Sequence, residues 1–316
     1  MTNYDAIEIA IDAASSTDGK LSISMAALDT EIPDYRTLST TREVVASFKG
    51  MLSSFLNKYQ KMHKNGDLRI VKYSPDFKPD SHHLEFIKVK GSHFESIINS
   101  VPEPSDTTVL DPEDIKFIDK LKFYVMIIKH ENKRILVFKR YSKTKELGHR
   151  GGFLISWIGK QYGKVSDSVF SFDNQFDCLV VDGVLLSFNK KNTEIIFKYY
   201  DELRSSAFTT IDKIAQHIPI HNLEEFKHDC STHLHKLGKL RNIAQKGYLP
   251  NLSIDKIRKI INKFHLSINI VVINGKEMLQ HDPADKWALL NLLDDSYLSS
   301  ALTGYDYEVN SKLILN

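Results

Sequence analysis

The stretch FDCLVVDGVLLSFNKKNTEIIFKYYDEL, residues 176–203, decides the fold. Two apolar, β-branched runs flank Asp182-Gly183. Asp-Gly between such runs predicts a tight β-hairpin, because both residues tolerate the positive φ of a type I′ turn. Asn192 is a candidate N-cap for a helix that follows the hairpin. The apolar positions of that helix recur at helical spacing, at Ile195, Ile196, Tyr199 and Leu203.

Upstream of this stretch the pattern is mixed. Alternating apolar residues on either side of Asp18-Gly19 predict an opening β-hairpin, with Ile7, Ile9 and Ile11 before the turn and Leu21, Ile23 and Met25 after it. Thr40-x-x-Glu43 is a capping box, and the apolar 3–4 spacing after it predicts an amphipathic helix that ends near Asn65-Gly66. These elements and the strands predicted after them indicate a small α+β unit.

Residues 101–114, VPEPSDTTVLDPED, are acidic, proline-rich and without periodicity. They read as a linker. We therefore expect two domains, an N-terminal α+β domain over residues 1–110 and a second over residues 111–316. The overall fold class is α+β.

The second domain starts with strand-like sequence and continues with amphipathic helices. Strands are predicted over residues 123–129, 134–141, 153–158 and 169–172, and with the Asp182-Gly183 hairpin they could form one antiparallel sheet. A long helix is predicted from Asn222 onward. Its apolar stripe comprises Leu223, Phe226, Cys230, Leu234, Leu237, Leu240 and Ala244.

Charge is unevenly distributed, although the whole chain carries only +2. Residues 1–118 hold 13 basic and 18 acidic residues (−5), residues 119–265 hold 26 and 15 (+11), and residues 266–316 hold 3 and 7 (−4). Residues 119–164 alone hold 12 basic and 3 acidic residues, a net +9. Such a block predicts a polyanion partner for the middle of the chain.

The candidate DNA-contacting residues cluster in this block, in a strand end and the glycine-rich loop after it: Lys139, Arg140, Lys143, Lys145, His149, Arg150, Lys160 and Lys164. Lysine and arginine there would gain affinity by releasing counterions from a nucleic acid. The alternative is a solvated loop with ordinary surface charges. A second basic group, Lys236, Lys239, Arg241 and Lys246, is expected as the solvated face of the long helix.

The sequence gives only weak signals for a nuclease or for a metal site. Asp173, Asp177 and Asp182 lie near the hairpin, as nuclease carboxylates often do, but no Glu-x-Lys follows on the next strand. His228, Cys230, His233 and His235 lack the paired spacing of a zinc site. Cys178 and Cys230 are expected to be buried reduced thiols. We expect no enzyme activity, cofactor or metal. Without an apolar span or a secretory signal, the chain is expected in the cytoplasm.

Two parts of the chain resemble a known family. The first comprises Phe176-Asp177, Asp182-Gly183, Asn189 and Phe197, and the second is the ending LLDDSYLSSALTGYDYEVNSK, residues 292–312. Together they resemble the KwaB family of the Kiwa anti-phage defence system, over residues 120–316. One departure is Thr193-Glu194, where the family pattern usually has Phe-Glu.

The resemblance implies a cytoplasmic effector without an assigned catalytic centre. It would bind phage DNA, associate with the multi-span membrane protein KwaA, and block phage DNA replication and late transcription. We also expect a homo-oligomer, and localisation at the inner membrane only through the partner. In the closing motif, the apolar residues are expected to pack, and Asp294, Asp295 and Lys312 to form ion pairs or caps. The alternatives are a metal-dependent DNA nuclease and a protein–protein adaptor that does not bind DNA.

Overall fold

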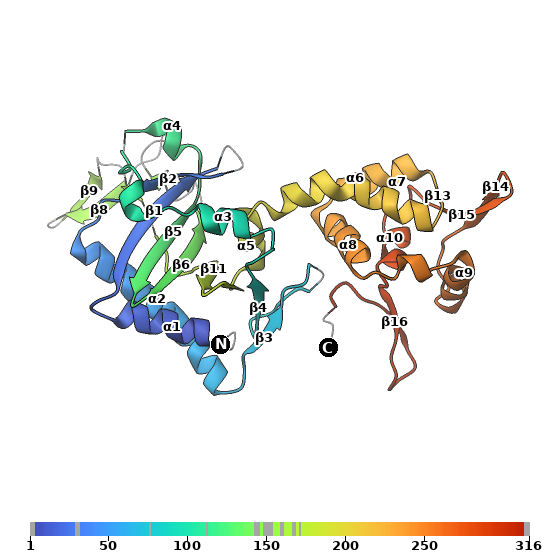
Figure 1. Ribbon diagram of the computed structural model, residues 1–316, viewed down its shortest axis with the longest axis horizontal. Coiled ribbons are helices and arrows are strands. Elements are labelled where there is room, and N and C mark those ends of the chain that lie inside the picture. The colour runs from blue at the N-terminus through green and yellow to red at the C-terminus, as the bar shows by residue number, and fades with distance from the viewer. Residues whose placement is uncertain are drawn as a thin grey trace. The chain divides into compact units, whose positions relative to one another are not determined.

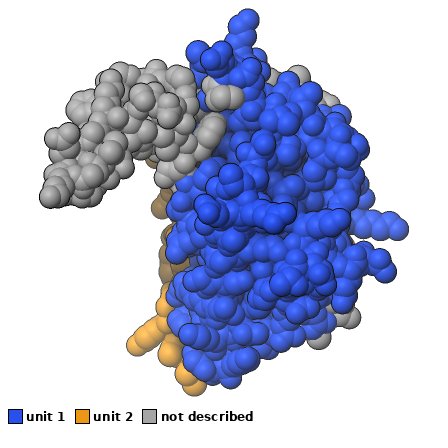
Figure 2. Space-filling view, turned by 90° about the vertical axis from the view of Figure 1, so that its left-hand side faces the viewer, with its two compact units in different colours: residues 1–73, 79–197 blue, residues 74–78, 198–316 orange. Residues whose placement is uncertain are grey.

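A computed structural model describes residues 4–28, 32–75, 77–111, 113–141, 146–147, 154–158, 161–165, 169–170 and 172–312. The chain forms two compact units, one of residues 1–73 and 79–197 and the other of residues 74–78 and 198–316 (Figure 1, Figure 2). The division near residue 110 that the linker predicted lies inside the first unit. Among the described helices, none is long and apolar enough to span a membrane.

The first unit is built on an eight-stranded sheet with the order β2-β1-β5-β6-β11-β12-β4-β3. Its neighbours are antiparallel except β3 and β4, which are parallel. The strands are β1 (Lys20–Ala27), β2 (Asp34–Thr37), β3 (Arg69–Lys72), β4 (His83–Lys88), β5 (Leu121–His130), β6 (Lys133–Arg140), β11 (Cys178–Val181) and β12 (Val184–Ser187). The α+β class is confirmed, and the sheet draws strands from both sides of residue 110.

Helices α1 (Asp5–Ser15) and α2 (Arg42–Lys64) cover one face of this sheet (Figure 1). The predicted opening hairpin is therefore wrong in its first half. Ile7, Ile9 and Ile11 alternate, but Ile7 and the alanines before, between and after them form a buried helical stripe. The buried residues of α1 are Ala6, Ile7, Ala10, Ala13 and Ala14. The segment is a helix because its buried residues recur at helical spacing, although the isoleucines alone alternate as in a strand.

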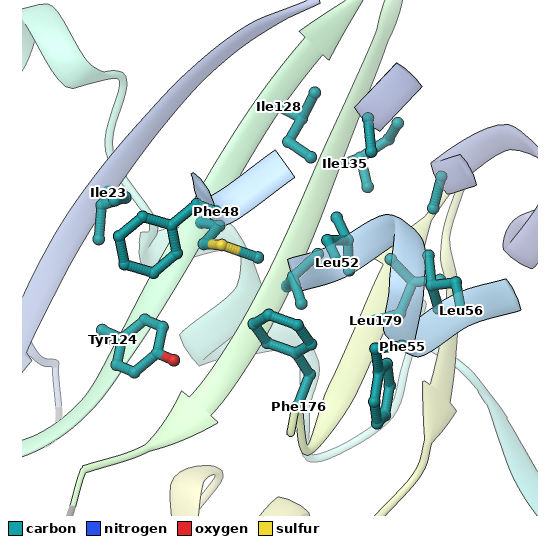
Figure 3. Close-up of a cluster of buried hydrophobic side chains, with 14 of the residues drawn as sticks. Ile23, Phe48, Leu52, Phe55, Leu56, Tyr124, Ile128, Ile135, Phe176 and Leu179 are labelled. Carbon is teal, nitrogen blue, oxygen red and sulfur yellow. The ribbon is translucent and has the colours of Figure 1, made fainter. Parts of the chain in front are cut away.

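The core between the helices and the sheet is aromatic and aliphatic (Figure 3). Thr41 caps α2 by accepting the backbone N–H of Val44, so the helix starts one residue later than the predicted capping box with Thr40 as its cap. The buried stripe of α2 comprises Phe48, Leu52, Phe55, Leu56 and Tyr59. Phe55 meets Phe176 edge to face, with ring centroids 5.3 Å apart. The stretch that decides the fold is thereby joined to α2.

The opposite face of the sheet is also covered, by residues that include α3 (Glu95–Ser100) and α5 (Lys190–Ile196). Phe138 of β6 lies 5.2 Å from Phe197, and Phe197 lies 5.3 Å from Phe94, between ring centroids. The predicted linker belongs instead to the core beneath α1 and α2, because Leu110 lies in the same buried cluster as Ile7 and Leu52. It includes a short 3₁₀ helix (Pro104–Asp106), Leu110 is buried, and α4 (Ile115–Ile118) follows it.

The Asp182-Gly183 hairpin is confirmed. β11 and β12 pair with Val181 opposite Val184, and the two turn residues have φ of 48° and 75°. The helix after it begins earlier than predicted, because Asn189 rather than Asn192 is its cap. Lys198, with φ of 53°, then separates α5 from α6 (Tyr199–His217).

Four short strands lie between β6 and β11: β7 (Glu146–Leu147), β8 (Leu154–Ile158), β9 (Gln161–Val165) and β10 (Val169–Phe170). In the described part of the chain, β8 pairs with β9 and β7 with β10, each as a two-stranded sheet. The prediction that residues 153–158 and 169–172 extend one common sheet is therefore wrong.

The second unit is mainly helical. The predicted long helix is two helices, because Thr232 and His233 interrupt it between α7 (Leu223–Ser231) and α8 (Leu234–Gln245). A 3₁₀ helix (Leu249–Asn251), α9 (Ile254–Lys263) and α10 (Ala288–Leu293) follow. β13 (Ile220–His221), β15 (Lys276–Gln280) and β14 (Ile270–Ile273) form a small sheet. β16 (Tyr297–Ser299) and β17 (Asp306–Glu308) form a separate hairpin.

Candidate nucleic-acid interface

The predicted DNA-contacting segment starts at the end of β6. Cys178 pairs with Phe138, so the chain just before β11 lies beside the last residues of β6. Asp177 donates its backbone N–H to the carbonyl of Phe138. This pairing places the Asp177 carboxylate next to Lys139 and next to Arg140, which is 37 residues away in the sequence.

Asp177 is the hub of this corner. It is fully buried, and its carboxylate accepts the Arg140 backbone N–H at 2.6 Å and the Asn192 amide at 2.9 Å. Burial raises the pKa of Asp177, although these two hydrogen bonds oppose the shift. Its carbonyl oxygen accepts the backbone N–H groups of Phe188 and Asn189. One residue therefore joins β6, the end of β12 and the start of α5.

Lys139 and Arg140 have different surroundings. Lys139 is buried, and its Nζ lies 3.4 Å from Asp173 Oδ1 and 3.9 Å from Asp177 Oδ1. Its ammonium thus faces two carboxylates. Arg140 is exposed, and its guanidinium donates to Asn192 Oδ1 at 3.3 Å. Of this pair, Arg140 is the residue that solvent and a ligand can reach.

The remaining members of the predicted set lie further along. Lys164 is in β9, where its backbone is paired with Ile155. The other five lie outside the described residues: Lys143, Lys145, His149, Arg150 and Lys160. The predicted interface thus extends from a defined anchor at Arg140, and its loop contacts stay a prediction.

The second basic group is not the solvated face that the sequence predicted. Lys239 donates to Asp294 Oδ2 and to Ser296 Oγ, each at 2.8 Å, and Lys246 Nζ lies 3.2 Å from Asp294 Oδ1. Lys312 Nζ lies 2.9 Å from Asp294 Oδ2. Asp294 is fully buried. The expectation of ion pairing for Asp294 and Lys312 is confirmed.

The electrostatics of this cluster favour the ionised acid. Burial alone would raise the pKa of Asp294, but the hydrogen bonds from Lys239 and Lys312 and the charges of Lys239 and Lys246 together outweigh it, and the pKa lies below its usual value. Sequence spacing gave no signal for this cluster, because 55 residues separate Lys239 from Asp294. The spacing of Asp294 and Lys312 within one closing motif was the usable hint.

A further buried polar group surrounds Asp229. Its carboxylate contacts His281 Nε2 at 3.0 Å and Lys286 Nζ at 2.8 Å. Lys236, also from the group predicted as solvated, is buried and donates to the carbonyl of Lys286. These contacts stabilise the second unit internally.

The structure also bears on the thiol and metal expectations. Cys178 and Cys230 are both buried free thiols, as predicted. Burial raises the pKa of Cys178 and raises that of Cys230 to about 12, so both are protonated at neutral pH. Within the described ranges, no three His, Cys, Asp or Glu side chains gather into a group that could hold a metal ion.

Comparison with known protein families gives one match, which includes the candidate interface. The family model described as Kiwa protein KwaB-like matches residues 118–303. The comparisons with curated proteins and with solved structures find no match.

Proposed function

The chain belongs to the KwaB-like family of Kiwa proteins and is a Kiwa anti-phage defence component, and from this premise we propose that it is the DNA-binding effector of the system. The proposed ligand is phage DNA, bound through its phosphate backbone with weak sequence preference. Contacts to phosphate carry affinity and orientation without reading base sequence.

The observation that carries the proposal is the concentration of positive charge in the segment that starts at Arg140. Much of the positive charge before Arg140 already has partners: Lys129 and Arg134 with Glu103, Lys133 with Asp182, and Lys139 with Asp173. Residues 140–164 hold 6 basic residues and 1 acidic residue, so their net charge is 6 − 1 = +5. This segment is the best candidate for phosphate contacts.

We propose that the chain acts beside a membrane-embedded partner, KwaA. It would stay in the cytoplasm, associate with the inner membrane only through that partner, and block phage DNA replication and late transcription. We also propose that it self-associates. Expressed without KwaA, the chain is expected in the supernatant after high-speed centrifugation. Recovery with membranes in that strain would contradict the partner-dependent localisation.

Duplex binding across a salt series tests the DNA proposal. Lys143, Lys145 and Arg150 are changed together to Ala, and binding is followed by fluorescence anisotropy with two unrelated sequences. Affinity for both should fall, and the slope of log K against log salt should flatten by about one unit or less per lost contact. Equal wild-type affinity at low and high salt would contradict the proposal and favour the adaptor function.

The matched control for this experiment removes three positive charges elsewhere in the chain. Lys256, Lys259 and Lys263 are exposed on α9, so their change to Ala removes the same charge without opening the core. Lys236 and Lys239 are unsuitable because they are buried. Loss of binding in the α9 variant, with normal binding by the loop variant, would assign the DNA contact to the second unit.

A nuclease is the second candidate, because Asp173 and Asp177 both lie near the Lys139 ammonium. We propose that the protein does not hydrolyse DNA, RNA or nucleotides. Incubation of purified protein with DNA and Mg²⁺ or Mn²⁺ tests this. Cleavage that Asp173→Ala abolishes would establish the nuclease instead.

A further inference from the structure

The closing motif forms a hairpin whose apolar side chains are exposed rather than packed. Leu298 pairs with Tyr307, and Tyr305 continues the same side of the ladder through its carbonyl, which accepts the Ser300 N–H. The exposed fractions are 41% for Leu298, 49% for Tyr307, 68% for Tyr305 and 94% for Leu302 at the tip. Packing was expected for these residues, so that expectation is wrong in the single chain.

The base of this hairpin is firmly held. Val309 donates its backbone N–H to the carbonyl of Ser296 at 2.8 Å, and Asn291 donates to Glu308 Oε1 at 2.8 Å. Lys312, just beyond β17, is paired with the buried Asp294. A two-stranded hairpin alone is marginally stable in water, so these anchors are what order it. An ordered apolar projection loses little entropy when it binds a partner.

The charge of the hairpin limits the chemistry of that partner. Residues 295–308 include Asp295, Asp306 and Glu308 and no lysine or arginine. A nucleic acid or an anionic membrane surface would be repelled by these carboxylates. An apolar pocket with a basic group at its edge is the complementary surface, and exposed apolar patches of this kind mark protein contacts.

The second unit itself carries such a pocket. It lies between α6 and α8 and has a volume of about 220 Å³. Its apolar lining includes Leu203, Leu237 and Leu240, and its polar lining includes Ser206, Thr210 and Arg241. Arg241 is half-buried, with its guanidinium 5.0 Å from the centre of the Tyr199 ring.

We propose that the hairpin tip of one copy docks into the α6–α8 pocket of a second copy. Leu302 enters between the leucines, and the carboxylate of Asp306 pairs with Arg241 of the other copy. In a two-fold dimer each copy supplies one hairpin and one pocket, so both contacts form together. This contact deepens the proposed self-association and is independent of DNA binding.

Self-association of the purified full chain tests the proposal, measured by sedimentation across a concentration series. Leu302→Asp should weaken the dimer by about tenfold or more, as loss of a buried central anchor does. Val272→Asp is the matched control, because Val272 is 67% exposed on β14 of the same unit. Arg241→Asp and Asp306→Arg should each weaken the dimer, and combining them should restore it.

Cross-linking locates the contact directly. Ala244 is exposed in the pocket lining, so Leu302→Cys combined with Ala244→Cys should give an oxidised dimer that neither single variant gives. The native thiols are buried and should not interfere. A wild-type chain that is monomeric throughout, or a dimer unaffected by Leu302→Asp, would overturn the proposal, and capture of KwaA by the hairpin in a monomeric chain would assign it to that protein.

DNA affinity is measured on the same samples. Leu302→Asp should bind a short duplex as the wild type does. A dimer that binds no DNA would contradict only the proposed DNA binding, and a DNA-binding monomer would contradict only the proposed self-association and its docking contact.

Discussion

The carboxylate of Asp177 accepts the backbone N–H of Arg140, with 2.6 Å between Oδ2 and the nitrogen. A buried acid before β11 therefore fixes the residue at which the basic segment leaves β6. The same carboxylate accepts the Asn192 amide, so α5 and the basic segment share one anchor. Loss of Asp177 should consequently affect the fold and the proposed DNA contact together.

Asp177→Ala should lower the free energy of unfolding by about 1–3 kcal/mol, because two partly buried donors lose their acceptor. Urea unfolding followed by circular dichroism measures this. Asp18→Ala is the control, since Asp18 is exposed, and its effect should stay within about 0.5 kcal/mol. Equal stability of the two variants would contradict the role of Asp177 as an anchor.

Neighbouring cations at the end of β6 should separate stability from DNA affinity. Lys139→Ala leaves the buried Asp177 without its ammonium neighbour and should cost about 1–3 kcal/mol. Arg140→Ala removes an exposed guanidinium, so it should weaken DNA binding and leave the unfolding free energy nearly unchanged. The opposite assignment, with Lys139→Ala stable and defective in binding, would place Lys139 in the interface.

Acid should destabilise the second unit through Asp294. Because its pKa in the folded state lies below 3.8, the folded state holds fewer protons than the unfolded state near that pH. The ionised Asp294 carboxylate therefore contributes to stability above the pKa it has in the unfolded state. That contribution is lost as the pH falls through its pKa in the folded state. Asp294→Asn should be less stable at pH 7 by about 3–5 kcal/mol, since three buried or partly buried ammoniums lose their counter-charge.

The pH dependence distinguishes this role from simple packing. Between about pH 6 and about pH 3, the midpoint temperature of thermal unfolding should fall less steeply for Asp294→Asn than for the wild type. The control is Asp255→Asn on α9, whose carboxylate is mostly exposed beside Arg258. An Asp294→Asn variant with the wild-type pH profile would argue against a carboxylate that is ionised in the folded state.

Two glycines should respond to alanine with opposite signs. Gly183 has φ of 75° in the hairpin turn, so Gly183→Ala should destabilise the first unit by about 1 kcal/mol or more. Gly50 lies within α2 with open space around its Cα, so Gly50→Ala should stabilise it by about 0.5–1 kcal/mol. Differential scanning calorimetry measures both, and a stabilised Gly183→Ala would contradict the positive-φ turn.

Features set by neighbouring residues could be predicted well. The Asp182-Gly183 turn, the start of α2 within one residue of the predicted Thr40 cap and the pairing of Asp294 with Lys312 each depend on short segments. The breaks in the helices could not be predicted from the same patterns. The apolar spacing of residues 223–244 continues across Thr232 and His233, although the helix is interrupted there between α7 and α8.

The candidate site could be predicted as a charged segment but not as a surface. Composition identifies Lys139 and Arg140 equally, yet one is buried beside two carboxylates and the other is exposed. Lys239 was expected in solvent and lies in a buried ion-pair cluster. Counting charges cannot separate these cases, because the partner that neutralises a cation comes from a distant part of the chain.

The sequence by itself determined the α+β class, the family and the local turns and caps, since dihedral preferences and side-chain periodicity act over a few residues. Only the tertiary structure decided which strands share the eight-stranded sheet, which lysines are neutralised and that the hairpin of the closing motif is exposed. Those outcomes depend on burial and pairing between residues tens to hundreds of positions apart. Lys139 with Asp177, and Lys239 with Asp294, show that a charge acquires its role from the carboxylate the fold brings to it.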